Sequence, residues 1–412
     1  MSKRKQKPMM VEKHKIGESS QFFKLISGFC ARSKSLYNQA NYIVRQEFIK
    51  NGKWIRYEQL DSILKADTEF PSYRNMPTAQ SAQQCLKLVD SSWKGYFASI
   101  NDYMEHKEKY EGKPGLPKYL KESEMQVLTL TNQDCKFVTG EIKFPKVFQG
   151  FKLKTHCHEN PMFKSFQQVR IVPHKHFLVV EVVYAINEPS LLESNGRVIG
   201  IDIGVNNLAT VSNNIGEQAF IINGKPLKSI NQYWNKITSH YREVAKRMNK
   251  LDFTDHMRRL TDNRTARIND YLHKASRYIV NFCLKHDIRT IIIGKNEGWK
   301  QEVNIGRQNN QTFVQIPFAR FIDMIQYKAK NVGIAVITTE ESYTSGTSVI
   351  DDEAPTKEFY NKKRRVKRGM FVSNSGIRIN ADLNSAYQII KKVVPIKWDS
   401  GCVLHPVVVN IA

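Results

Sequence analysis

The sequence predicts a mixed α/β fold in which helical and antiparallel-strand regions precede a half of alternating strands and helices. Apolar residues recur at helical spacing from about residue 17 to 110, and β-branched and aromatic runs follow from about 125 to 187. Strand and helix patterns then alternate to the end of the chain. A chain of 412 residues is long enough for two or three domains.

The helical region carries its own start and stop signals. Apolar side chains repeat at helical spacing over 22–30 and again over 85–97. Pro77 stands at a predicted helix start, where Thr78 is available as the capping residue. Two glycines and two prolines within 111–118 indicate a boundary loop.

The next region has the composition of short strands. Segments 127–130, 169–172 and 177–184 are rich in β-branched and aromatic residues and are separated by turns. This pattern predicts a small antiparallel β-barrel, followed by a linker over 188–197.

The C-terminal half begins with three predicted strands and continues with helices that alternate with single strands. This order is the layout of an RNase H-like domain, interrupted by a polar segment from about 340 to 378. The predicted strands are 198–203, 207–212, 218–222, 290–293 and 334–338, and the predicted helices are about 228–250, 256–287, 318–331 and a last one from near Ala381.

Three acidic residues at element ends are the candidate catalytic residues. Asp202 lies in IGIDIGVNNLATV, Glu297 in TIIIGKNEGWK and Asp382 in INADLNSAYQII, so only a tertiary fold brings them together. Carboxylates that converge in one cleft repel one another unless cations bind there, and hard oxygen ligands suit Mg²⁺ or Mn²⁺. Two such ions would cleave a phosphodiester, one by activating water and the other by stabilising the leaving 3′ oxygen.

Two asparagines flank the last acid. Asn380 and Asn384 stand two residues before and two residues after Asp382. Both are candidates for orienting the carboxylates by hydrogen bonds without being metal ligands themselves, and Asn380 is equally a candidate helix cap.

The composition indicates a nucleic-acid partner and a reducing compartment. The formal net charge of +24 predicts attraction to polyphosphates, although a histone-like binder without an active site has the same property. None of the six cysteines lies in a CxxC pair, which argues against a disulfide framework. No long apolar run indicates a membrane span or a signal peptide, so a prokaryotic cytoplasmic protein associated with the nucleoid is expected.

In this order, the three acidic segments resemble the RuvC-I, RuvC-II and RuvC-III motifs of TnpB, the transposon-encoded RNA-guided nucleases that are similar to compact type V CRISPR effectors. Further stretches resemble the family's recognition-lobe helix (76–97), its basic helix between the first two motifs (264–282) and the start of its insert (340–353). The resemblance implies that Asp202, Glu297 and Asp382 are metal ligands. It also implies a guide RNA and cleavage of double-stranded target DNA beside a short transposon-adjacent motif.

The resemblance further implies a domain order. A wedge-like β-barrel is expected from 1–16 together with 120–195, and a helical recognition lobe from 17–119. A RuvC-like nuclease domain is expected from 196–339 together with 379–412, and the protein is expected to be a monomer within its ribonucleoprotein.

One departure from the family concerns its insert, 340–378. The family commonly carries a four-cysteine zinc ribbon there, whereas this chain has no cysteine between Cys283 and Cys402, and Thr347 falls where a first ligand is expected. No zinc is therefore expected. The insert instead carries a run of basic residues that we interpret as a phosphate-binding strip, with a merely solvated loop as the alternative. The run includes Lys363, Arg364, Arg365, Lys367 and Arg368.

Other polar residues are candidates for nucleic-acid contact, with a solvated helix face as the alternative for each. Gln80, Ser81 and Gln84 lie beside Lys87 on the predicted recognition-lobe helix and have the chemistry to read base edges. Arg264 and Arg267 lie on the basic helix and are candidates for contacts to the guide–target backbone.

Three rival functions share parts of this pattern. A compact type V CRISPR effector would use the same chemistry. A guide-dependent DNA-binding repressor would not cleave, but all three acids are present here. A strand-joining transposase shares the metal chemistry, but a guide-binding front half fits it poorly.

Overall fold

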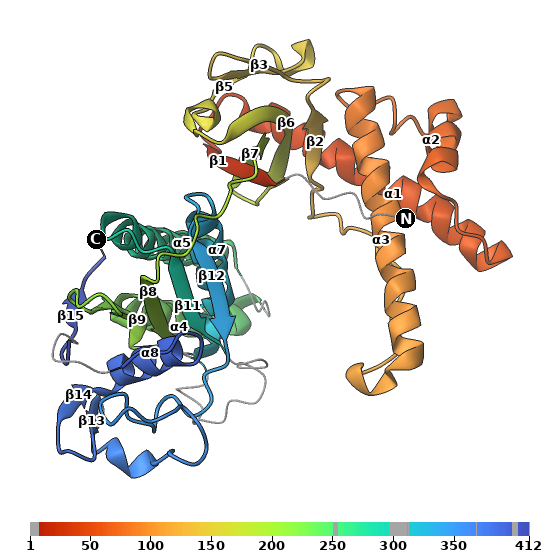
Figure 1. The fold of residues 1–412 in the computed structure, drawn as a ribbon. Coiled ribbons are helices and arrows are strands. Elements are labelled where there is room, and N and C mark those ends of the chain that lie inside the picture. Colours follow the sequence, from red (N-terminus) through yellow and green to blue (C-terminus); the bar gives the residue numbers. More distant parts are fainter. Residues whose placement is uncertain are drawn as a thin grey trace. The chain divides into compact units, whose positions relative to one another are not determined.

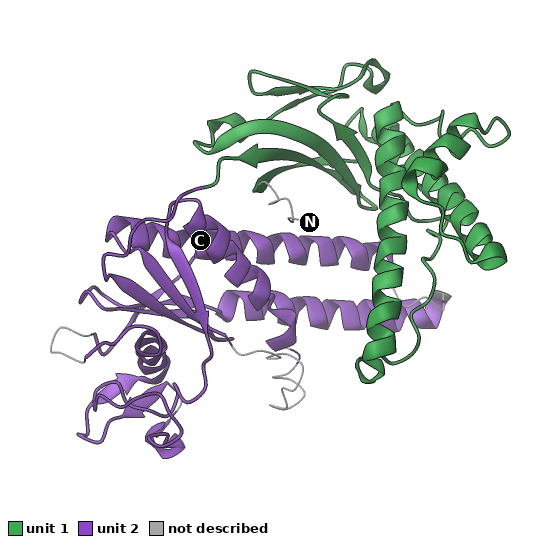
Figure 2. Ribbon diagram, turned by 45° about the vertical axis from the view of Figure 1, so that its right-hand side comes forward, with its two compact units in different colours: residues 1–188 green, residues 189–412 purple. Residues whose placement is uncertain are grey.

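The chain forms two compact units, Met1–Glu188 and Pro189–Ala412 (Figure 2), each with its own hydrophobic core. The computed structural model describes residues 8–249, 254–295, 311, 313–367, 369–397 and 403–411. Among the helices within these ranges, none is both long and apolar enough to cross a bilayer.

The first unit contains a helical region whose longest members pack on each other (Figure 1). The predicted start of the third helix is confirmed, because Thr78 caps it: its side chain accepts a hydrogen bond from the Ser81 backbone at 3.0 Å. Trp93 is fully buried and donates from Nε1 to Asn41 Oδ1 at 3.0 Å, which joins the two long helices. The helices are α1 (Phe23–Asn51), α2 (Tyr57–Ala66) and α3 (Ala79–Glu105).

The strands of the first unit form two antiparallel sheets. Strand β1 (Met9–Gly17) pairs along its whole length with β7 (Phe177–Ile186), and the larger sheet has the order β1-β7-β6-β2. Because β1 and β2 pair with no further described strand, this sheet is open and the predicted barrel is not confirmed. The remaining strands are β2 (Leu128–Thr131), β3 (Lys136–Val138), β4 (Glu141–Lys143), β5 (Lys152–Lys154) and β6 (Phe163–Pro173), with β3, β4 and β5 in the smaller sheet.

The second unit is built on a six-stranded mixed sheet of order β12-β11-β8-β9-β10-β15. Strands β8, β9 and β10 run antiparallel as successive hairpins, whereas β11 and β12 run parallel to β8. This α/β arrangement is consistent with a RuvC-like fold. The strands are β8 (Val198–Ile203), β9 (Asn207–Asn213), β10 (Phe220–Asn223), β11 (Thr290–Gly294), β12 (Ala335–Thr339) and β15 (Val407–Val409).

Side chains of β8 alternate between two cores because successive strand residues point to opposite faces. Ile199 and Ile201 belong to the core that includes α5 (Asp255–Lys285) and α7 (Phe318–Lys330), whereas Val198 belongs to the core that includes α8 (Ala381–Lys391). Asp202 therefore lies on the α8 face of the sheet. The remaining long helix of this unit, α4 (Lys225–Asn249), packs along α5.

Gly200 lets α8 approach the central strand closely. A Cβ at this position would lie 2.2 Å from the Ala386 carbonyl oxygen and 2.6 Å from Ile390 Cγ1. Only a residue without a side chain fits there, and the close contact brings the first turn of α8 near the end of β8.

The insert between β12 and α8 is compact. Its short strands β13 (Met370–Val372) and β14 (Arg378–Asn380) pair with each other, and Phe371 and Ile379 join the α8 core. The insert also contains a short 3-10 turn, Lys362–Arg364. Further 3-10 turns lie in the first unit, at Lys107–Lys109, Lys146–Phe148 and Cys157–Glu159. The five described cysteines are free and buried.

Candidate active site

Asp202 reaches the site from the end of the central strand. It follows Ile201, which pairs in register with Ile293 of β11, and Ile293 in turn pairs with Thr338 of β12. The three parallel strands therefore end at one edge of the sheet, beside Asp202. The apolar neighbours Ile201 and Ile203 fix the register of β8. A shift of the strand by one residue would turn these two side chains toward α8 and Asp202 toward the opposite core.

Asp382 reaches the same edge from the first turn of α8. Asn380 is the N-cap of this helix, and its side chain accepts hydrogen bonds from the Asp382 and Leu383 backbone N–H groups, each at 3.0 Å. The interpretation of Asn380 as a helix cap is thus confirmed. The positive end of the helix dipole favours the negative charge of Asp382.

Asp202 and Asp382 line one cavity of about 1100 Å³. The lining also includes the loop between β8 and β9 and several residues of the insert. Lys225 and Arg365 bring positive charge to the lining. The two acids from the sequence analysis that the structure describes are therefore neighbours in space.

A third described acid, Glu341, lies in the same cavity. It follows β12 by two residues, so it leaves the sheet at the edge where β8 ends. Gly294, the last residue of β11, makes room for it: a Cβ there would lie 2.6 Å from Glu341 Cγ. The sequence analysis missed Glu341, although an acid just past the end of a strand parallel to β8 was a usable signal.

The electrostatics of the cavity favour added positive charge. Burial, together with the nearby carboxylates of Asp382 and Glu341, raises the pKa of Asp202 well above its ordinary value, while Arg365 acts in the opposite direction. Burial raises the pKa of Glu341 to about 7, and Lys392 opposes this shift. The ionised forms of Asp202 and Glu341 are therefore disfavoured by burial, and positive charge near them would favour these forms.

Asp382 is held by two side chains that the sequence analysis did not place at its carboxylate. Asn207 donates from Nδ2 to Asp382 Oδ2 at 2.7 Å, and Arg365 donates from Nη2 to Asp382 Oδ1 at 3.0 Å. Asn207 comes from β9 and Arg365 from the insert. The carboxylate is therefore oriented from two directions.

The residue types at this site fit a hard divalent cation. Asp202, Glu341 and Asp382 offer carboxylate oxygens, and the buried hydroxyl of Thr210 has no hydrogen-bond partner among the described residues. As placed, no three His, Cys, Asp or Glu side chains of the described residues are gathered closely enough to hold a metal ion. Glu297, the remaining predicted ligand, lies outside the described residues.

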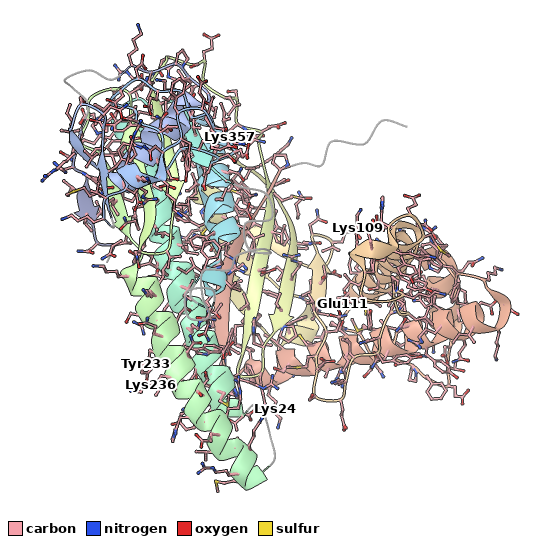
Figure 3. All side chains as sticks on the ribbon, turned by 90° about the horizontal axis from the view of Figure 1, so that it is seen from below. Lys24, Lys109, Glu111, Tyr233, Lys236 and Lys357 are labelled. Carbon is pink, nitrogen blue, oxygen red and sulfur yellow. The ribbon has the colours of Figure 1, made fainter. Side chains whose placement is uncertain are left out.

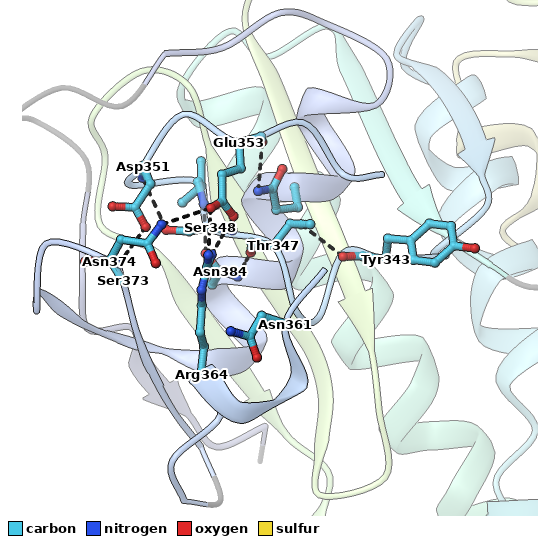
Figure 4. A network of polar contacts seen from close by, with 12 residues as sticks. Tyr343, Thr347, Ser348, Asp351, Glu353, Asn361, Arg364, Ser373, Asn374 and Asn384 are labelled. Atoms are coloured by element: carbon cyan, nitrogen blue, oxygen red, sulfur yellow. Dashed lines mark hydrogen bonds and ion pairs between the residues drawn. The ribbon is translucent and has the colours of Figure 1, made fainter. Parts of the chain in front are cut away.

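Asn384 does not reach toward the carboxylates. Its buried side chain accepts a hydrogen bond from the Val349 backbone at 3.1 Å and donates to the Thr347 carbonyl at 2.8 Å (Figure 4). Its hydrogen bonds therefore hold the insert against α8, which replaces the predicted role of orienting Asp382.

Two of the predicted phosphate-binding arginines are bound to acids. Arg364 pairs with the buried Glu353, and Arg365 pairs with Asp382. The prediction of a phosphate-binding strip does not fit Arg364, whose guanidinium is taken up by the buried Glu353, whereas Arg365 lines the cavity and stays a candidate for phosphate contact. Lys363 and Lys367 are exposed and stay candidates, and Arg368 lies outside the described residues.

The residues on α3 that were predicted to contact nucleic acid also differ in their surroundings. Ser81 is 1% exposed and completes the cap of its helix, since its hydroxyl accepts from the Thr78 backbone at 3.2 Å. It is therefore not placed to read a base. Gln80 and Gln84 are half-buried, whereas Lys87 is exposed and its Nζ lies 5.2 Å from the Tyr57 ring centroid.

On the basic helix α5, Arg264 and Arg267 have different surroundings. The Arg264 guanidinium lies over the Trp234 ring and donates to Asn231 Oδ1 at 2.7 Å, and burial lowers its pKa. These contacts join α4 to α5, so the predicted contact of Arg264 with the backbone of the guide–target duplex is not supported. Arg267 is exposed and borders a cavity of about 460 Å³ between α4 and α5.

The exposed side of α4 adds to this surface. Tyr233, which also borders the cavity, and Lys236 project from the same side of the helix (Figure 3). Tyr233 is 58% exposed, so its ring is open to a stacking partner. With Arg267, these residues form the α4–α5 surface, a candidate nucleic-acid interface.

Comparison with known proteins bears on the class of this site. Residues 181–300 match the family model OrfB_IS605, described as "Probable transposase", and residues 318–389 match the model of the Cas12f1-like TNB domain. A curated relative, the TnpB-like protein ORF457 of Acidianus two-tailed virus, is 22% identical over 396 residues, which cover 88% of this chain and 82% of the relative.

Solved structures with low overall similarity include two Cas12 proteins. CasPhi-2 (Cas12j), bound to crRNA and phosphorothioate DNA, gives a TM-score of 0.47 at 9% identity over 93% of this chain and 91% of that one. Cas12f1, in complex with sgRNA and target DNA, gives a TM-score of 0.36 at 14% identity over 92% and 98%.

The mixed sheet and the acidic cavity of the second unit are consistent with a RuvC-like α/β fold. The two family models and the curated relative support a TnpB-type protein, so the resemblance found in the sequence is confirmed.

Proposed function

We propose that the chain is an RNA-guided DNA endonuclease that cleaves double-stranded target DNA beside a short transposon-adjacent motif. The observation that carries the proposal is the single cavity shared by Asp202, Glu341 and Asp382, which come from three separate parts of the second unit. The TnpB-type relationship supports an RNA-guided nuclease in general. The net charge of +24 supports guide RNA and target DNA as partners.

Two divalent ions, Mg²⁺ or Mn²⁺, would supply the activated water and stabilise the leaving 3′ oxygen. Asp202 and Asp382 would hold them with carboxylate oxygens. Asn207 keeps the Asp382 carboxylate oriented, and the cap at Asn380 fixes the helix turn that carries it. Arg365 brings a guanidinium to a cavity that must admit a phosphodiester, which gives the anionic substrate a counter-charge.

The third ligand is proposed as one of two acids. The resemblance assigns the role to Glu297, whereas the described geometry brings Glu341 beside Asp202. In the sequence, Glu297 follows β11 and Glu341 follows β12, the two strands parallel to β8, and paired substitutions distinguish the two acids.

The decisive experiment combines cleavage with guide identification. Protein purified with its bound RNA is mixed with target DNA and Mg²⁺, and Asp202→Ala is compared with the wild type. We expect a uniform, structured RNA in both preparations and loss of cleavage in the variant alone. Cutting by Asp202→Ala near the wild-type rate, or random RNA fragments in both, would overturn the proposal.

A compact type V CRISPR effector is the second candidate, favoured by the match of residues 318–389 to the Cas12f1-like domain. It would use the same acids. The co-purifying RNA separates the two candidates, because a CRISPR effector would carry repeat-derived RNA and the favoured protein would carry RNA from a transposon end.

A further inference from the structure

The insert contains a buried carboxylate that binds three parts of the chain (Figure 4). Glu353 is 8% exposed, and its two oxygens accept four hydrogen bonds. Arg364 donates from Nη1 at 2.5 Å and from Nη2 at 2.8 Å, the Ser348 backbone donates at 2.8 Å and Asn374 Nδ2 donates at 3.2 Å. One side chain therefore ties together the beginning, middle and end of the insert.

The same network is fastened to α8. Gln388 donates from Nε2 to the Glu353 carbonyl at 3.2 Å, and Asn384 bonds the backbone of Thr347 and Val349. Asp351 adds a further connection by accepting a hydrogen bond from the Asn374 backbone at 2.8 Å. Because α8 also carries Asp382, the insert and the candidate catalytic acid share one rigid support.

A buried ion pair of this kind is sensitive to the loss of either partner. The Glu353–Arg364 pair is bidentate, and the remaining capacity of the carboxylate is filled by Ser348 and Asn374. Removing one charge leaves the other buried and unpaired, which is costly. The pairing also raises the pKa of Arg364.

Arg364 and Arg365 are consecutive but serve different acids. Arg364 is held by Glu353 inside the insert, and the next residue reaches Asp382 Oδ1 at 3.0 Å. We propose that Glu353 is a positioning residue of the candidate active site, which places Arg365 on Asp382 by anchoring Arg364 and the insert loops to α8. This inference rests on the proposed function and deepens it.

The network also accounts for an ordered insert without cysteine ligands. Thr347, where the resemblance places a first zinc ligand, is fully buried and donates from its hydroxyl to the Tyr343 carbonyl at 2.9 Å. Hydrogen bonds around Glu353 join the beginning, middle and end of the insert without using a cysteine. The arrangement should therefore be insensitive to zinc chelators.

The test is the substitution Glu353→Gln, with Asp352→Asn as its matched control. Asp352 is the preceding residue, is exposed and pairs with Lys391 at the end of α8, so the control removes the same charge and an exposed contact to α8 but leaves the four hydrogen bonds of Glu353 intact. We expect Glu353→Gln to slow single-turnover DNA cleavage by about 10- to 100-fold at unchanged RNA and target binding. Asp352→Asn should stay within about twofold of the wild type, as surface substitutions usually do.

A double-mutant cycle separates positioning from a general structural effect. If Glu353 acts through Arg365, the variant Glu353→Gln with Arg365→Ala should cleave no more slowly than Arg365→Ala alone. Multiplied losses, or wild-type cleavage by Glu353→Gln, would overturn the inference. If Glu353→Gln fails to fold, Arg364→Lys takes its place in the same double-mutant cycle. This milder substitution keeps the positive charge but loses the bidentate contact to Glu353.

Limited trypsin digestion keeps this inference distinguishable from the proposed function. The insert carries several exposed lysines, including Lys362 and Lys363. We expect Glu353→Gln, but not Asp352→Asn, to be cut faster within 357–367, and a zinc chelator to change neither pattern. If the wild type cleaves no DNA, the proposed function fails while this digestion still decides whether Glu353 anchors the insert.

Discussion

Arg365 Nη2 lies 3.0 Å from Asp382 Oδ1, and Asn207 Nδ2 lies 2.7 Å from the other oxygen of the same carboxylate. The two donors come from the insert and from β9, so two distant parts of the second unit meet at one acid of the candidate site. Arg365 also moderates the raised pKa of Asp202. The insert is therefore linked to both aspartates, through a contact to one and through charge to the other.

Removal of the Arg365 side chain should affect catalysis more than binding. We expect Arg365→Ala to lower the single-turnover rate of target cleavage by about a hundredfold, because a donor at the reacting phosphate contributes mainly in the transition state. Target binding, measured by gel shift, should change little. Lys363→Ala removes an exposed cation from the same run and is the matched control. Equal cleavage rates for the two variants would contradict this role.

Glu341 should control the pH dependence of ion binding. Its pKa is raised to about 7, so the carboxyl is largely protonated below that pH and becomes a better ligand as the pH rises through it. Calorimetric titration with Mn²⁺ should show tighter binding with increasing pH across this range. Glu341→Gln should weaken binding and flatten this part of the profile.

Glu297→Gln provides the comparison for that experiment. If Glu341 is the third ligand, only Glu341→Gln should lose ion binding and cleavage together. The reverse result, with normal ion binding in Glu341→Gln and loss of ion binding in Glu297→Gln, would show that Glu297 is the third metal ligand, as the resemblance indicates.

Elements with strong apolar spacing were predicted well. Strand β8 was predicted with its observed bounds because Ile199 and Ile201 make it apolar on both faces, and Thr78 marked the start of α3. Strand β1 was assigned to the β region only through the resemblance and not from its own pattern, because along this edge strand only Ile16 is buried and the sequence pattern is correspondingly weak.

The site depended more on tertiary structure than the elements did. Asp202 and Asp382 were recognisable from their local motifs, whereas Glu341 becomes a neighbour only through the register of β11 and β12 with β8. The basic run of the insert looked uniform in sequence. Whether a guanidinium faces solvent or a buried acid depends on partners such as Glu353, which the local sequence does not identify.

Substitution of Gly200 should disturb both the stability of the second unit and the geometry of its site. A methyl group there would meet the Ala386 carbonyl and the Ile390 side chain, so α8 must move away from β8. We expect Gly200→Ala to lower the free energy of unfolding by about 1–3 kcal/mol and to slow cleavage, because Asp202 and Asp382 separate. Urea denaturation followed by circular dichroism measures the first effect.

Gly95→Ala is the control for that substitution. Gly95 lies within helix α3, and no neighbouring atom comes within 4 Å of the position that an alanine methyl group would take. Alanine should therefore stabilise the helix by about 0.5–1 kcal/mol. A Gly200→Ala protein as stable as the wild type would show that α8 and β8 are not closely packed.

Lys328 should make the stability of the second unit depend on alkaline pH. This lysine is 5% exposed and donates to the His273 carbonyl at 2.6 Å and to Ser276 Oγ at 2.7 Å. Burial, with a smaller effect from Arg277, lowers its pKa to about 8, compared with about 10.4 in an unfolded chain. Between these values the unfolded state binds more protons, so the free energy of unfolding should rise with pH, by at most about 3 kcal/mol.

Comparison with Lys328→Met isolates this contribution from that of the tyrosines, which titrate in the same range. We expect the difference in unfolding free energy, wild type minus Lys328→Met, to increase from pH 8 to pH 10 in urea denaturation experiments, because methionine does not titrate. Lys330→Met, which removes an exposed lysine from the same helix, controls for the loss of a charge. Parallel stability curves for the wild type and Lys328→Met would mean that this buried amine keeps its proton throughout, held by its two hydrogen bonds.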